Sequence, residues 1–184
     1  KWGVYVPGVT GIHPMLKEEL VNLPYLLKLD VTADGEKLDM ELPGIHNYRR
    51  CLDFRDGVLY RDFDWRTESG LVRCQYRRFL PRQLKRVVVQ EFSFQVASGR
   101  CRLTIENGID CKVTTNGYNH FKKVEESGEA GRRGCVVQTD NGDSIRMLSM
   151  LFDSQGKVLG PVVDSVLREG ETLTLVITVY TDHD

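Results

Sequence analysis

Apolar side chains recur at every second position in several short segments of the chain. The clearest case is TLTLVITVY, residues 172–180, where leucine, isoleucine and valine occupy one face and threonine most of the other. The same alternation is found in LLKLDVT (26–32), VVVQEFSFQV (87–96) and CRLTIEN (101–107). Because successive side chains of a strand point to opposite faces, this period predicts half-buried β-strands.

Turn-forming dipeptides separate these segments at intervals of about ten residues. Asp34-Gly35 and Asp56-Gly57 are strong signals of tight hairpins. Further pairs occur at 69–70, 98–99, 107–108, 116–117, 141–142 and 155–156. We therefore predict one antiparallel all-β domain over residues 1–184, a β-sandwich of roughly ten or more strands with little helix.

Two segments lack the strand pattern. MLKEELVNL (15–23) is the one helical candidate, because it could form two turns of helix before Pro24. KKVEESGEAGRRG (122–134) is polar and glycine-rich, so we expect a flexible surface loop there.

The net charge of the 184-residue chain is −1, which argues against nucleic acid or an anionic membrane as the main partner. No apolar run approaches the length of a membrane span, and the first residues lack the apolar core of a secretory signal. The five cysteines are odd in number and form no C-x-x-C pair. We therefore expect buried, reduced thiols and a cytoplasmic location.

The segment YRRCLDFRDGVLYRDFDW, residues 48–65, combines eight charged residues with five aromatic ones. It predicts a hairpin whose first strand ends near Phe54, whose turn is 55–57 and whose return strand is 58–65. Neither face of the return strand is wholly polar, so both faces should be partly covered. In a sandwich only one face of a sheet meets the core, so the other face needs its own explanation.

Two explanations remain open for the charged hairpin. It could form a cross-strand ion-pair ladder, with four arginines pairing with three aspartates: Arg73, Arg77, Arg78 and Arg82 with Asp53, Asp62 and Asp64. Alternatively, another domain or a subunit covers it, since such interfaces favour Arg, Tyr and Trp. The candidate interface residues are then Tyr60, Asp62, Asp64, Trp65, Arg77 and Arg78. A catalytic carboxylate pair is disfavoured, because oppositely charged neighbouring strands are common on half-exposed sheets.

Other chemistry-bearing residues give no motif. His13, His46, His120 and His183 are far apart and lack metal-ligand spacing, so we expect surface or loop histidines. There is no G-x-S-x-G nucleophile turn and no phosphate-binding P-loop. Four aromatic residues could form a sugar-stacking platform: Trp2, Tyr25, Trp65 and Tyr118. For Trp65, packing in the core or at an interface is the favoured role. We assign no catalytic, cofactor-binding or metal-binding residue.

Three segments, residues 19–40, 48–66 and 77–94, resemble the amino-terminal domain of glycoside hydrolase family 65. The telling positions are Asn22-Leu23-Pro24, Tyr48-Arg49-Arg50, Leu52-Asp53, Gly57 and Arg78-Phe79. The closing VITVYTDHD resembles the end of the same domain. That family includes phosphorylases of maltose, trehalose, kojibiose and nigerose, together with some hydrolases.

The resemblance implies a galactose-mutarotase-like β-super-sandwich that packs on an (α/α)₆ catalytic barrel of the same polypeptide. The barrel would supply the acid glutamate and bind inorganic phosphate, the co-substrate, so no catalytic residue transfers to this chain. The parent would break an α-glucoside with inversion. Family members carry a Gly-Asn-Gly segment and further strands before the counterpart of GVYVPGV (3–9), so we expect a fragment of a larger domain. A homodimer is a further candidate assembly. The alternative function is a stand-alone carbohydrate-binding or structural β-sandwich.

Overall fold

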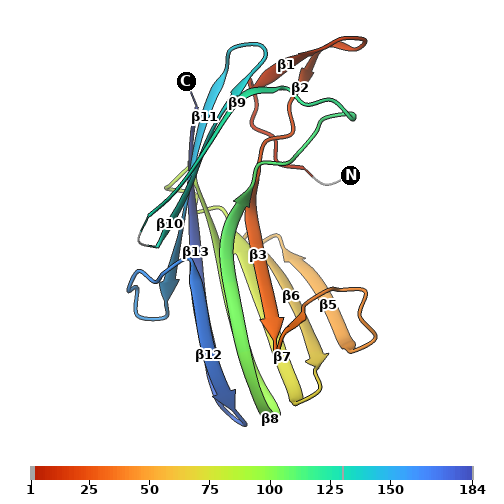
Figure 1. The fold of residues 1–184 in the computed structure, drawn as a ribbon, viewed down its shortest axis with the longest axis vertical. Coiled ribbons are helices and arrows are strands. Elements are labelled where there is room, and N and C mark those ends of the chain that lie inside the picture. Colours follow the sequence, from red (N-terminus) through yellow and green to blue (C-terminus); the bar gives the residue numbers. More distant parts are fainter. Residues whose placement is uncertain (1–2, 130, 184) are drawn as a thin grey trace.

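The computed structural model describes residues 3–129 and 131–183, and the described residues form strands, turns and loops without a helix (Figure 1). Thirteen strands are present in this part of the chain. They are β1 (Thr10–His13), β2 (Lys17–Leu20), β3 (Tyr25–Ala33), β4 (Glu36–Lys37), β5 (Ile45–Asp53), β6 (Val58–Arg66), β7 (Gly70–Phe79), β8 (Val87–Asp110), β9 (Phe121–Glu129), β10 (Arg132–Thr139), β11 (Ser144–Asp153), β12 (Val162–Arg168) and β13 (Thr172–His183). The described residues therefore include no helix that could cross a membrane.

The strands build two antiparallel sheets that share β8. The large sheet has the order β5-β6-β7-β8-β13-β11-β10-β9. The small sheet is formed by β12, β8, β3 and β4. Residues 87–99 of β8 pair in the large sheet, and residues 100–110 pair in the small sheet. Figure 1 shows β3 and β8 in front of β6 and β7, and a separate hairpin, β1–β2, lies at one end of the molecule.

The core lies between the inner faces of these two sheets. On the large sheet β8 buries Phe92, Phe94 and Val96, and on the small sheet it buries Cys101, Leu103 and Ile105. The change of sheet occurs at Gly99, which has a φ of +81°. A side chain there would also collide with the Ser69 carbonyl oxygen, so glycine suits this crossing on two grounds.

The antiparallel all-β sandwich predicted from the period-two pattern is confirmed. The predicted strand at 172–180 lies within β13, and its Leu175, Ile177 and Val179 are buried. The predicted hairpin at 48–65 is formed by β5 and β6. Its Gly57 has a φ of +67°, as a tight turn requires.

Two local predictions are wrong. The loop expected over 122–134 is instead largely strand: residues 122–129 lie in β9 and residues 132–134 in β10, and β9 is an edge strand of the large sheet. An edge strand needs no apolar pattern, so its charged residues concealed it. Residues 15–23 contain β2 rather than helical turns. Here Leu16 and Leu20 are exposed while Val21 and Leu23 are buried, so the apolar spacing did not mark one helical face.

Candidate functional site

The outward face of β5, β6 and β7 carries most of the charged hairpin. Strand register places Tyr60 beside Arg77, and Asp64 beside Arg73. The Arg77 guanidinium lies 5.8 Å from the centre of the Tyr60 ring, and its Nη1 lies 3.4 Å from Oε1 of Glu91. Asp64 accepts a 2.7 Å hydrogen bond from Nδ2 of Asn47 and lies 3.9 Å from Nε of Arg73.

These contacts form only part of the predicted ion-pair ladder. Of the predicted pairs, the described residues contain one, between Arg73 and Asp64. Arg77 pairs with Glu91 of β8 instead of an aspartate. The Arg73 and Arg77 side chains are 60% and 56% exposed. Ion pairs this exposed contribute about 0–1 kcal/mol each, so they contribute little to holding this face together.

The six candidate interface residues lie on two opposite faces of the large sheet. Tyr60, Asp62, Asp64 and Arg77 face outward. Trp65 faces the core and is fully buried, so its assignment to an interface is wrong. The charges beside Trp65 in the sequence belong to the outward face, and strand alternation alone would have placed Trp65 inward.

Arg78 also faces inward, toward the small sheet. Its Nε donates a 2.8 Å hydrogen bond to Oε1 of Gln90, a buried side chain of β8. Burial is the main cause that lowers the pKa of the Arg78 guanidinium, and neighbouring Arg61 and Arg50 lower it further. Arg78 therefore belongs to a different surface from Arg77.

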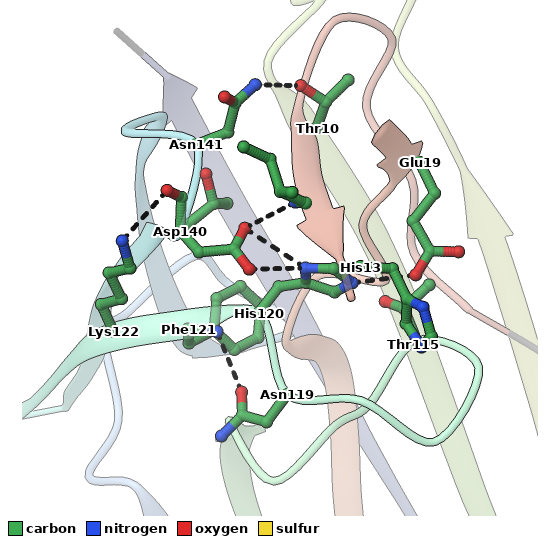
Figure 2. Close-up of polar contacts among 12 residues, drawn as sticks. Thr10, His13, Glu19, Thr115, Asn119, His120, Phe121, Lys122, Asp140 and Asn141 are labelled. Atoms are coloured by element: carbon green, nitrogen blue, oxygen red, sulfur yellow. Dashed lines mark hydrogen bonds and ion pairs between the residues drawn. The ribbon is translucent and has the colours of Figure 1, made fainter. Parts of the chain in front are cut away.

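Two of the four histidines, which were expected at the surface or in loops, are buried together near the β1–β2 hairpin. Figure 2 shows His120 between two carboxylates, which approach it from different parts of the fold. Nδ1 of His120 lies 3.0 Å from Oδ2 of Asp140, and Nε2 lies 2.9 Å from Oε1 of Glu19. The His120 side chain has no exposed surface. His13 is also buried, and its ring centre lies 6.3 Å from that of His120.

The cluster joins three segments that are distant in sequence. Glu19 comes from β2, His120 precedes β9, and Asp140 begins the turn after β10. Asp140 also accepts a 2.9 Å hydrogen bond from the Ile12 backbone N–H, which ties β1 to the same turn. Gly11 permits this approach, because a Cβ there would collide with the His120 ring. His120 does lie in a loop, as expected, but both His13 and His120 are buried, and His13 belongs to β1, so the expectation of surface or loop histidines is wrong for His13.

The geometry of the cluster favours a structural role. Both ring nitrogens of His120 lie within hydrogen-bond distance of carboxylate oxygens, so this one imidazole links two acidic side chains. The hydrogen bond from His120 is the largest cause that lowers the pKa of Glu19. Among the described residues no group of three or more His, Cys, Asp or Glu side chains has an arrangement suited to a metal ion. The arrangement is a clamp of two carboxylates on one imidazole, here called the His120 clamp: Glu19, His120 and Asp140.

The other candidate groups do not converge on a site. Of the possible sugar-stacking platform, Trp2 lies outside the described residues, Trp65 is buried in the core, and Tyr118 packs edge-on against His120 at 4.8 Å. The cysteines are free, and four are buried as predicted, whereas Cys51 is exposed on β5. Burial raises the pKa of the Cys101 thiol to about 12, which keeps it protonated and unreactive.

Comparison with known proteins gives a consistent family relationship. A family model described as "Glycosyl hydrolase family 65, N-terminal domain" matches residues 3–184. The kojibiose phosphorylase of Escherichia coli strain K12 is 25% identical over 195 residues, covering 98% of this chain and 25% of the relative. The nigerose phosphorylase of Lachnoclostridium phytofermentans is 29% identical over 128 residues, covering 66% and 17%. The chain thus spans at most about a quarter of these relatives.

A solved structure described as "Putative kojibiose phosphorylase from human microbiome" shares the fold. It superposes with a TM-score of 0.82 at 19% sequence identity. The match covers all of this chain and 27% of the other.

Proposed function

Because the chain belongs to the N-terminal domain of glycosyl hydrolase family 65, we propose that it is a non-catalytic β-sandwich domain of an α-glucoside phosphorylase or hydrolase. The observation that carries this proposal is the family match over residues 3–184 together with the small share of each relative that the chain covers. In the proposal, an (α/α)₆ barrel elsewhere in the same polypeptide carries the chemistry. The β-sandwich packs on that barrel and supports its assembly and the rim of the active site.

The proposed chemistry belongs to that barrel. Inorganic phosphate or water would attack the anomeric carbon while a carboxylic acid protonates the leaving oxygen, with inversion. The carboxylic acid and the phosphate site would both lie outside this chain. The free thiols favour a reducing, cytoplasmic setting for such an enzyme.

The outward face of the hairpin is the surface that we assign to a partner within this proposal. Tyr60, Asp62, Asp64 and Arg77 combine an aromatic ring with charges of both signs, and weak ion pairs leave them available for other contacts. Inter-domain surfaces are more polar than cores, so such a face fits the barrel, the linker to it or the second subunit of a homodimer.

The test of the proposed function compares this chain with the longer polypeptide that contains it. The isolated chain should release neither glucose nor glucose 1-phosphate from maltose, kojibiose or nigerose in the presence of phosphate. The longer polypeptide should release one of them. A coding sequence with no helical-barrel segment on either side of this domain would contradict the proposal.

A further inference from the structure

Three arginines lie together on the inward face of β5, β6 and β7. Arg50 is directly opposite Arg61 in the register of β5 and β6. Arg78 of β7 is one diagonal step from Arg61, because its direct partner is Leu59. The three line one groove of about 710 Å³ with Met40, Ile45 and Tyr48. We call this the arginine groove.

The positive charge of the arginine groove is not balanced within the described residues. No carboxylate oxygen in residues 3–129 or 131–183 lies within 4 Å of a guanidinium nitrogen of these three arginines. Asp110, which lines an adjoining hollow with Arg50 and Arg78, instead accepts the Lys112 backbone N–H. Like charges on directly opposed strand positions repel each other, so this face carries an unfavourable energy that a bound anion would relieve.

The side chains that contact Arg78 and Arg61 directly are neutral. Arg78 bonds to Gln90, and the Arg61 guanidinium lies 5.6 Å from the centre of the Tyr76 ring. The outward face of the same strands differs, since Arg73 and Arg77 each have an acidic partner there.

The groove is open because the small sheet stops short of it. The two-residue strand β4 pairs only with Thr32 and Ala33 of β3. The described residues provide no strand beside the rest of this edge of β3, from Leu26 to Asp30. Figure 1 shows β5 and β6 extending past β3 on the side away from β8. One more strand beside β3 would therefore lie over the arginine groove.

An apolar hollow of about 670 Å³ continues the groove along β5 and β6. Leu27, Leu52, Leu59, Leu80 and Tyr5 contribute to its lining, and Arg78 borders both hollows. Tyr5 is 51% exposed and Leu80 is 71% exposed. Large side chains this open, beside unpaired charges, are typical of a surface that a polypeptide covers.

We propose that an extended acidic segment adds as a strand to the free edge of β3 and places its carboxylates on Arg50, Arg61 and Arg78. The occupant is a segment of the same polypeptide outside these 184 residues, so the inference rests on the proposed function. Backbone hydrogen bonds to β3 set its register, and alternate side chains face the groove. Acidic side chains meet the arginines, and apolar ones meet Leu52 and Leu59.

The test uses a fluorescent blocked hexapeptide of alternating Thr and Glu at low salt, with fluorescence anisotropy as the readout. The wild-type chain should bind this peptide and not the matched Thr-Lys peptide. The R50Q/R61Q double variant should bind about tenfold more weakly or worse, because two charge-assisted contacts are lost. The control R132Q/R168Q makes the same change in net charge on exposed residues of β10 and β12 and should bind as wild type. Circular dichroism should show that both double variants remain folded.

Two further measurements identify the mode of binding and its source. Hydrogen exchange should slow at β3 amides between Leu26 and Asp30 when the Thr-Glu peptide binds. Inorganic phosphate alone should not slow them, and if phosphate reproduces the effect, the ligand is a free anion and the strand proposal is wrong. Equal binding by wild type and R50Q/R61Q would also overturn it.

The failure of this inference can be distinguished from failure of the proposed function. In the longer polypeptide, R50Q/R61Q should lower the melting temperature of the assembled protein more than R132Q/R168Q does. An active, assembled enzyme that tolerates R50Q/R61Q as well as its control would overturn the inference alone. A longer polypeptide without glycoside-cleaving activity would overturn the proposed function.

Discussion

Nε2 of His120 lies 2.9 Å from Oε1 of Glu19, although 101 residues separate the two in the chain. With Asp140 on the other ring nitrogen, this contact fixes the β1–β2 hairpin against the turn after β10. The His120 side chain has no exposed surface, so its ring nitrogens cannot exchange these partners for water without opening this end of the sandwich.

Replacing His120 by Ala should lower the free energy of unfolding by about 3 kcal/mol or more, because the buried imidazole leaves a cavity and Asp140 and Glu19 lose the hydrogen-bond partner that they share. Urea denaturation followed by circular dichroism measures the change. The matched control is His46→Ala, which removes an exposed histidine of β5 and should cost within about 0.5 kcal/mol. Similar losses for both variants would contradict the role of the clamp.

Stability should fall at acidic pH partly through Glu19. The hydrogen bond with His120 holds the Glu19 pKa below its ordinary value of 4.5. As the pH falls, Glu19 is therefore protonated in the unfolded chain at a higher pH than in the folded chain. The stabilisation from this carboxylate is therefore present above pH 4.5 and is lost as pH falls from there through the lower pKa of the folded state.

The variant Glu19→Gln measures that contribution. It should be less stable than wild type at neutral pH and should lose less stability on acidification, while Asp140 remains on the ring in both proteins. Melting temperatures measured across the acid range test this. Parallel curves for the two proteins would show that Glu19 is not linked to folding.

Replacing Gly57 by Val should destabilise the domain by about 1 kcal/mol or more, because a β-branched residue adopts a positive φ only under strain. The site itself is open, with no atom within 4 Å of an added Cβ, so the cost isolates the backbone conformation. Gly160→Ala is the control, since Gly160 does not have a positive φ. An unchanged melting temperature for Gly57→Val would contradict the strained turn.

Changing Asp62 or Asp64 to Ala should cost the isolated domain no more than about 1 kcal/mol, because Arg73, the ion-pair partner of Asp64, is exposed, and Asp62 forms no ion pair within the described residues. In the longer polypeptide the same change should weaken domain docking or dimer formation, since arginines of this face would be left desolvated and unpaired. Thermal unfolding of both proteins and size-exclusion chromatography of the longer one test this. A loss of several kcal/mol in the isolated domain with intact assembly would contradict the interface.

Local patterns predicted much of the fold because strands and turns have short-range signatures. The alternation in 172–180 and the Asp56-Gly57 turn each depend on a few consecutive residues, and both appear in the structure. The strand at 121–129 was missed because an edge strand exposes both faces, so no apolar period marks it.

The polar sites could be predicted only in part, because they depend on contacts between distant segments. Strand alternation puts Tyr60 and Arg77 on one face, but the partner of Arg77 is Glu91 of a third strand. Nothing in the spacing of His120, Glu19 and Asp140 brings them together, since hairpins and loops make that contact. Arg50 and Arg61 lie opposite each other because of the register of the β5–β6 hairpin. In the sequence, only the turn residues of this hairpin indicate that register.

The shared strand β8 has a consequence for how the chain reaches this structure. Its partners include β3, near the beginning of the chain, and β13, whose paired residues extend to Tyr180. Contacts that close such long loops form slowly, as in other β-sandwiches. During synthesis, the two halves of the large sheet therefore cannot join until β13 has left the ribosome, because β13 lies between β8 and β11. Until then β8 and β11 each present an unpaired edge to other chains.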